Sequence, residues 1–202
     1  TIVAALAALQ AIENGHQAAL MAPTEILAEQ HYQKLSSWFD PLGIRVAWLS
    51  GSQKKKQKQA TLDDIASGNA HLAVGTHALF QEHVVFHQLG LAIIDEQHRF
   101  GVHQRLALRM KGALSNTVPH QLMMSATPIP RTLSMSYYAD LDVSIIDELP
   151  PGRAPIVTKL IADNRRDEII ERIKHACHQN KQVYWVCPLI EESETLQLQT
   201  AM

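Results

Sequence analysis

Cysteine is scarce in this sequence of 202 residues, and neither sign of charge is in large excess. Cys177 and Cys187 do not have CxxC spacing, which argues against a zinc site or a disulfide framework and indicates a reducing compartment. The formal net charge is −2. The overall charge therefore does not predict nucleic-acid binding. Any such binding must come from local basic patches.

Long apolar runs and metal-binding motifs are also missing. No apolar run approaches the ~20 residues that a membrane-spanning helix needs, and the start of the chain lacks the basic segment of a signal peptide. His83 and His87 lie four residues apart, but the stretch EHVVFHQLG is typical of a loop or short strand, and no HExxH motif occurs. We therefore expect no structural metal site.

What the sequence does contain is an alternation of short apolar runs with helical patterns. A helical pattern at the start ends at Gly15, and Thr24 can cap a second one. The apolar runs are short enough for strands that are covered on both faces, and they occupy Ala18–Ala22, Val46–Ser50, His71–Val74, Leu91–Asp95 and Gln121–Ser125. This alternation predicts an α/β fold with a mainly parallel sheet flanked by helices.

A boundary is predicted at Glu148–Pro155, ELPPGRAP, where three prolines and a glycine disfavour helix and central strand alike. We expect a first domain over residues 1–148, a linker over 149–155 and a second domain over 156–202. The second is too short for a complete α/β domain.

In the second segment the pattern of strands and helices starts again. Ile156–Ile161 and Gln182–Cys187 are predicted strands, and Asn164–His178 is a predicted helix between them.

Polar residues gather where the predicted strands of the first domain end. The runs lead into APTE, GTHA, DEQH and SATP, at residues 22–25, 75–78, 95–98 and 125–128. Ligands of open α/β sheets bind outside the carboxyl ends of the strands. Chemistry is therefore expected along one edge of the sheet.

Asp95 and Glu96 are the most informative residues at these ends. Two adjacent carboxylates are disfavoured in a confined site, and a bound Mg²⁺ would offset their charge. Asp95 can then hold the metal while Glu96 orients or deprotonates an attacking water. The simpler alternative is an exposed Asp-Glu pair at the start of a helix.

Hydroxyl groups follow another predicted strand. Ser125 and Thr127 can hydrogen-bond to the carboxylates of a neighbouring strand end, or they can simply cap the next helix.

Lysines gather in the segment Ser50–Gln59, SGSQKKKQKQ, which is expected to be a loop. Its four lysines suit contacts with DNA phosphates, although a solvated surface segment is the more economical interpretation; they are Lys54, Lys55, Lys56 and Lys58.

Four ordered stretches together resemble a known protein superfamily. MAPTEILAEQH, VGTHALFQ, IIDEQHRFGVHQR and MSATPIPRTL resemble motifs Ia, Ib, II and III of superfamily 2 helicases. With DELPPGRAPI and VYWVCPLIEESE, the chain resembles over nearly its whole length a bacterial family of ATP-dependent DNA helicases that remodel stalled replication forks and branched recombination intermediates. The resemblance implies a RecA-like fold of the P-loop NTPase type. Residues 1–148 would then form lobe 1, and 156–202 would be the incomplete start of lobe 2.

The resemblance also implies roles for individual residues. Glu96 would be the catalytic base for ATP hydrolysis, and Asp95 and Thr1 would bind Mg²⁺. The coupling of hydrolysis to movement on DNA would involve Gln97, His98, Ser125 and Thr127. Contacts with the DNA backbone would involve Thr24, Gly75, Thr76 and Arg131.

The same resemblance implies the setting of the protein. The cofactors would be ATP and Mg²⁺, and the partner would be forked or branched duplex DNA in DNA repair and recombination. The parent protein would be monomeric, cytoplasmic and associated with the nucleoid, without a membrane.

The sequence lacks several parts of this helicase family, among them the later motifs of the second lobe and the phosphate-binding loop. The phosphate-binding GxxxxGKT loop is not in the chain, and Thr1 matches the last residue of that loop. We therefore expect the isolated chain to be catalytically incompetent, and a non-catalytic nucleic-acid-binding module stays an alternative. Transcription–repair coupling translocases share TPIPRTL and RFGV but show DEE instead of DEQ, so Gln97 favours the fork-remodelling family.

Overall fold

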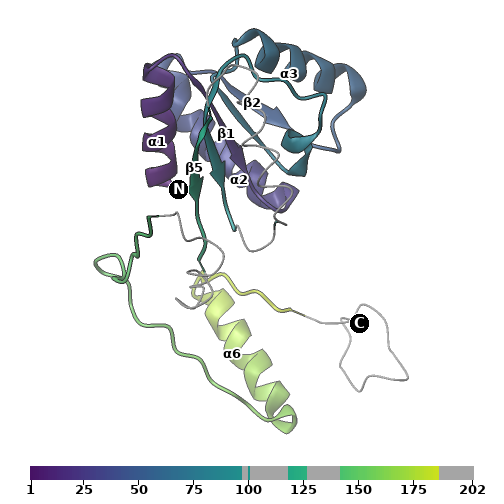
Figure 1. Cartoon of the computed structure of the whole chain (residues 1–202). Coiled ribbons are helices and arrows are strands. Elements are labelled where there is room, and N and C mark those ends of the chain that lie inside the picture. The colour runs from purple at the N-terminus through teal and green to yellow at the C-terminus, as the bar shows by residue number, and fades with distance from the viewer. Residues whose placement is uncertain (97–99, 101–117, 127–141, 187–202) are drawn as a thin grey trace. The chain divides into compact units, whose positions relative to one another are not determined.

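The computed structural model describes residues 1–96, 100, 118–126 and 142–186. The chain forms two compact units, Thr1–Leu141 and Asp142–Met202, and we describe each by itself (Figure 1). The division lies a few residues ahead of the predicted linker at 149–155. The assignment of the two units to helicase lobes stays a prediction.

The described part of the first unit is built around a five-stranded parallel sheet with the order β2-β3-β1-β4-β5. Each predicted strand is present within one or two residues of its expected bounds, so the predicted parallel α/β fold is confirmed. In chain order the elements are α1 Ile2–Glu13, β1 Gln17–Met21, α2 Glu25–Phe39, η1 Asp40–Leu42, β2 Val46–Leu49, α3 Lys55–Ser67, β3 Leu72–Gly75, η2 His77–Phe80, β4 Leu89–Ile94 and β5 His120–Met123.

Helices cover both faces of this sheet (Figure 1). On one face, Ala18 and Leu20 of β1 pack into a core with buried residues of α1 and α2. On the other face, Ala19 and Met21 pack with Ile65 of α3 and with η2. Because alternate residues of β1 face opposite cores, the strand is apolar throughout, without the alternation of a half-exposed strand.

The ends of the helices follow the predicted signals. Thr24 is extended and caps α2, and its Oγ1 accepts a hydrogen bond from the Leu27 amide at 3.3 Å. Gly15 follows α1 with φ +81°, a conformation that glycine adopts without strain. These caps fix where the chain leaves each helix and enters the sheet.

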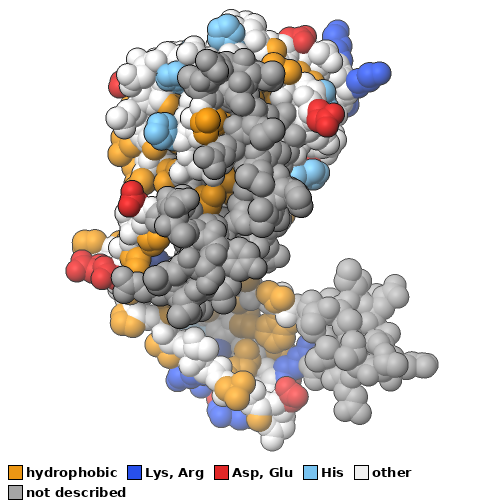
Figure 2. Space-filling model, viewed as in Figure 1, with side chains coloured by type: hydrophobic (Ala, Val, Ile, Leu, Met, Phe, Trp, Pro, Cys, Tyr) orange, Lys and Arg blue, Asp and Glu red, His pale blue; other side chains and the backbone are white. Residues whose placement is uncertain are grey.

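The lysine-rich segment is only partly a loop. Residues 50–54 form the turn, but α3 begins at Lys55, so the prediction of a loop through Gln59 was wrong. The side chain of Gln53 closes the turn, accepting from the Ser50 amide and donating to the Trp48 carbonyl. Lys, Gln and Ala are good helix formers, and the burial of Ile65 anchors the helix. The basic side chains project at the corner that α3 occupies (Figure 2).

Residues 81–88, which contain His83 and His87, form turns and irregular structure without a helix. Across the described ranges, no three His, Cys, Asp or Glu residues are grouped as they would be around a metal ion. Within the same ranges, no helix is both long enough and apolar enough to cross a bilayer.

The second unit contains a short turn, η5 Asp163–Arg165, and the helix α6 Arg166–His178, which confirms the predicted helix. The predicted strand Ile156–Ile161 was wrong, and residues 182–186 of the other predicted strand are also irregular. A strand needs a hydrogen-bonding partner, and no paired strand exists in the described part of this unit. α6 buries no residue, and it carries local ion pairs from Glu168 to Arg165 and Arg172.

Candidate functional site

Three of the predicted site residues meet at the carboxyl ends of β4 and β5. Asp95 and Glu96 directly follow β4, and Ser125 lies two residues beyond β5. The parallel register pairs Ile94 with Met123, so the two chain segments leave the sheet side by side. The Ser125 hydroxyl donates to Glu96 Oε2 at 3.3 Å, as expected for a hydroxyl facing a neighbouring carboxylate.

Asp95 has a partner that the sequence analysis did not identify. His31 of α2 places its Nε2 2.7 Å from Asp95 Oδ2, and the two side chains are only 11% and 20% exposed. The hydrogen bond with His31 is the main cause that lowers the pKa of the Asp95 carboxyl, against the opposing effect of burial. Asp95 is therefore an ionised, partly buried carboxylate at neutral pH.

Glu96 has an unusual backbone conformation. Its φ is +50°, in the left-handed region that costs a residue other than glycine about 1–3 kcal/mol and recurs at functional sites. Its amide also donates to Asp95 Oδ1 at 3.0 Å. The turn after β4 thus places the two carboxylates in a fixed relation to each other.

Thr1 lies at the start of α1, toward the end of the first unit to which the strands of the sheet point (Figure 1). Thr1 is the N-cap of α1 without a side-chain capping bond. Hydroxyl and carboxylate oxygens are hard donors, and this donor set suits Mg²⁺.

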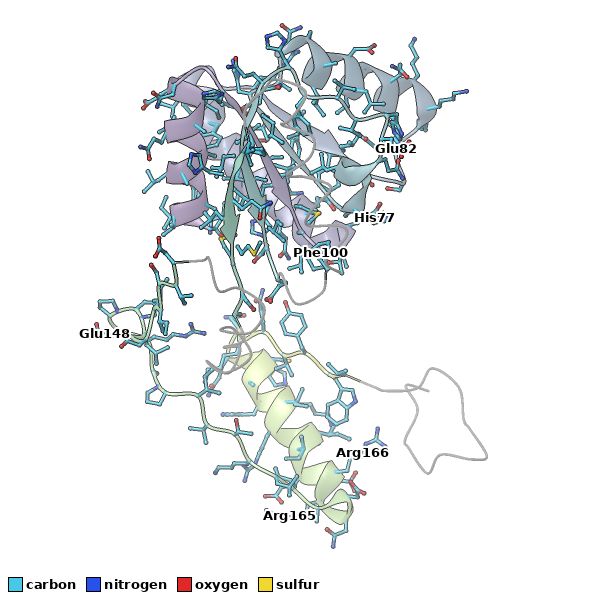
Figure 3. The ribbon with its side chains drawn as sticks, in the orientation of Figure 1. His77, Glu82, Phe100, Glu148, Arg165 and Arg166 are labelled. Carbon is cyan, nitrogen blue, oxygen red and sulfur yellow. The ribbon has the colours of Figure 1, made fainter. Side chains whose placement is uncertain are left out.

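A second polar cluster joins the ends of β1 and β2. Glu25 Oε1 accepts from the Ser50 hydroxyl and from the Ser52 amide, the latter at 3.3 Å, and the two serine hydroxyls lie 2.7 Å apart. The hydrogen bond from Ser50 is the largest cause that lowers the pKa of the Glu25 carboxyl, and His77 adds a smaller electrostatic effect. Figure 3 shows His77, after β3, and Phe100, after β4, at the same end of the first unit.

We expect Ser50→Ala to raise the pKa of Glu25 toward its ordinary value, measured by NMR titration of the carboxyl carbon. The folded state holds this pKa below the unfolded value of 4.5. The resulting stabilisation is therefore present above about pH 4.5 and is lost as the pH falls through the folded-state value. Ser37→Ala is the matched control. It removes a hydroxyl that donates to the Lys34 carbonyl, and it should leave the Glu25 titration unchanged. An equal shift in both variants would contradict the assignment to Ser50.

Three of the four predicted DNA-contacting residues lie at the ends of β1 and β3. Thr24 is exposed, but its hydroxyl is engaged in the helix cap. Thr76 is only 3% exposed, and Gly75 is the last residue of β3. A Cβ on Gly75 would lie 2.2 Å from the Leu49 carbonyl oxygen. The fold thus encloses the Thr76 side chain and leaves no room for a Cβ at Gly75, whereas the exposed Thr24 hydroxyl can still donate its proton to a ligand.

Four predicted site residues lie outside the described residues, namely Gln97, His98, Thr127 and Arg131. Sequence reasoning missed His31, although a signal was present. His31 shares a helical face with Ala28 and Leu35, which are both buried. A histidine on the buried face of a helix needs a polar partner, and this need could have singled it out.

A shallow surface groove lies apart from both clusters. Residues of α3 and of the irregular segment 81–88 line it, including Lys55, Lys58, His83 and Val85. None of the residues predicted to take part in chemistry lines this groove.

The parallel sheet covered by helices on both faces is the RecA-like fold of a helicase domain. The model of the DEAD/DEAH box helicase family matches residues 1–136, and the chain belongs to that family.

Within it, the chain is similar to ATP-dependent DNA helicases named RecG. The relatives from Haemophilus influenzae and Escherichia coli K12 are each 62% identical over all 202 residues, and the chain spans 29% of their length. A solved structure of RecG bound to a three-way DNA junction matches with a TM-score of 0.72 and 42% identity, over 89% of this chain and 23% of that one.

Proposed function

We propose that this chain is part of the motor of an ATP-dependent DNA helicase that remodels stalled replication forks and branched recombination intermediates. The observation that carries this proposal is the 62% identity over the full chain to the RecG relatives. The whole helicase, of which this chain would form about 29%, would act on forked or branched duplex DNA in repair and recombination. It would be a monomer in the bacterial cytoplasm, associated with the nucleoid.

The proposed chemistry is hydrolysis of ATP with Mg²⁺. Asp95 and Thr1 would hold the metal, which when bound supplies positive charge to the phosphates. Glu96 would accept the proton of the attacking water. The turn after β4 and the two bonds to Asp95 hold this carboxylate oriented before a ligand arrives, which is how such sites lower a barrier.

The proposed DNA surface lies at the ends of β1 and β3. Thr24 would donate its hydroxyl proton to a phosphate, and Gly75 and Thr76 would contact phosphates mainly through backbone amides, because the Thr76 side chain is buried. Such contacts position a duplex without reading its sequence. Arg131 is proposed for the same surface.

The sheet of the first unit would belong to the first RecA-like lobe of the motor, and α6 of the second unit would belong to the start of the second lobe. We propose lobe 1 over residues 1–148, a linker over 149–155, and the start of lobe 2 over 156–202.

Coupling between hydrolysis and movement is proposed for Gln97, His98, Ser125 and Thr127. In the whole helicase, Ser125→Ala combined with Thr127→Ala should leave ATP hydrolysis largely intact and should impair fork unwinding. A lost hydrogen bond of this kind costs about 0.5–1.5 kcal/mol, which is too little to stop the chemistry. It is nevertheless comparable with coupling energies of about 1–3 kcal/mol between sites.

The test measures ATP hydrolysis and unwinding side by side on the same folded variant. Ser67→Ala is the matched control. The Ser67 hydroxyl donates to the Asp64 carbonyl at the C-terminal end of α3, so this substitution should affect neither activity. A proportional loss of both activities in the double variant would contradict the coupling role and would favour a simple capping role for Thr127.

A further inference from the structure

The side chain of His31 reaches the strand-end carboxylates from a distant part of the chain. It lies on α2, 64 residues before Asp95, yet its Nε2 is 2.7 Å from Asp95 Oδ2. An ionised carboxylate can only accept hydrogen bonds, so the imidazole donates its Nε2 proton. With 11% of its side chain exposed, His31 is held against the sheet between the buried residues Ala28 and Leu35.

The two oxygens of Asp95 are held from two directions. Oδ2 accepts from His31, and Oδ1 accepts from the Glu96 amide at 3.0 Å. Two bonds on different oxygens fix the rotation of the carboxyl group as well as its position. Each oxygen still has a free lone-pair direction for a further partner, so these bonds orient the group without blocking it.

Metal-binding side chains generally depend on such outer partners. Carboxylates that ligate a metal are themselves hydrogen-bonded, and the loss of the outer partner typically costs about 10- to 100-fold in metal affinity. His31 itself is a poor candidate for a direct Mg²⁺ ligand, since Mg²⁺ prefers oxygen. His31 would instead bind the carboxylate that ligates the metal.

We propose that His31 is a positioning residue that orients the Asp95 carboxylate for Mg²⁺. This inference rests on the proposed function, because it takes Asp95 as the metal-binding carboxylate. It assigns to α2, whose start lies at the proposed DNA surface, a second role at the nucleotide site.

The experiment measures binding of a non-hydrolysable ATP analogue to the whole helicase as Mg²⁺ is titrated, and again with the metal chelated. His31→Leu keeps an apolar side chain in the space but removes the donor, whereas His31→Gln keeps an N–H donor. We expect His31→Leu to raise the Mg²⁺ concentration for half-maximal binding by about 10- to 100-fold. His31→Gln should stay within a few-fold of the unmodified protein. Binding without metal should not change in either variant.

Two further variants make the outcomes distinct. Gln33→Ala, on the exposed side of the same helix, should leave the Mg²⁺ requirement unchanged. Asp95→Asn should raise it at least as much as His31→Leu. A raised requirement in Asp95→Asn with an unchanged one in a folded His31→Leu protein would overturn the positioning role alone. An unchanged requirement in Asp95→Asn would overturn the proposed metal site and the role of His31 with it.

Discussion

Glu96→Gln in the whole helicase should nearly abolish ATP hydrolysis while nucleotide binding persists. The substitution keeps the size and hydrogen-bonding shape of the side chain but removes the proton acceptor. General-base contributions are typically about 10²- to 10⁴-fold, and we expect turnover to fall within that range. The place of Glu96 directly after β4, beside Asp95 and in a turn with φ +50°, supports its proposed role as the base.

The measurement combines phosphate release with binding of a fluorescent ATP analogue. Glu29→Gln, an exposed position on α2, is the matched control and should hydrolyse ATP normally. Near-normal turnover in Glu96→Gln would mean that another group accepts the proton. A parallel loss of nucleotide binding would mean that Glu96 acts in binding instead.

Gly75→Ala should destabilise the first unit markedly. A Cβ at this position would lie 2.2 Å from the Leu49 carbonyl oxygen, a separation that backbone atoms of neighbouring strands cannot tolerate. Gly75 pairs with Met21 on one side and Leu49 on the other, so relief requires β3 to move against both neighbours. Overpacking of this kind costs about 1–3 kcal/mol, or roughly 2–12 °C in Tm for a chain of this size.

Thermal unfolding of the chain, followed by circular dichroism, tests this prediction. Gly51→Ala is the matched control, because its nearest atom would be 4.0 Å away and its φ is not in the left-handed region. Its effect should stay within about 0.5 kcal/mol. Equal melting temperatures for Gly75→Ala and the unmodified chain would show that the strands separate easily at this point. The glycine would then be needed for ligand contact and not for packing.

The sheet could be predicted from sequence because its strands are buried on both faces. Runs such as 91–94 are continuously apolar, and polar residues follow directly from Asp95, so the sequence indicates both the strand and its end. The α2 cap was equally local, since Thr24 bonds an amide three residues away. Features of this kind depend on neighbours in the chain, and they were confirmed.

The second unit shows the limit of the same reasoning. Ile156–Ile161 has the composition of a strand, but composition does not supply a partner. In the structure this segment is irregular, and Ile156 and Leu160 are exposed. Strand formation depends on contacts between distant segments, so the apolar pattern alone could not decide it.

The residues of the candidate site also fall into those that local sequence predicts and those that it does not. Asp95, Glu96 and Ser125 were found from sequence because each directly follows a strand, and parallel strands bring their ends together. The contact of His31 with Asp95 and the bond of Ser50 to Glu25 join residues 64 and 25 positions apart. These pairs depend on the angle at which α2 crosses the sheet, which no local pattern encodes.

The most direct test of the motor assignment is ATP hydrolysis by the whole helicase, measured without DNA, with linear duplex and with a three-way junction. We expect DNA to stimulate turnover, the junction to stimulate it more than the linear duplex, and Asp95→Asn to remove the stimulated activity. Turnover that is unaffected by either DNA, or that survives Asp95→Asn intact, would contradict the assignment of this chain to a branched-DNA motor.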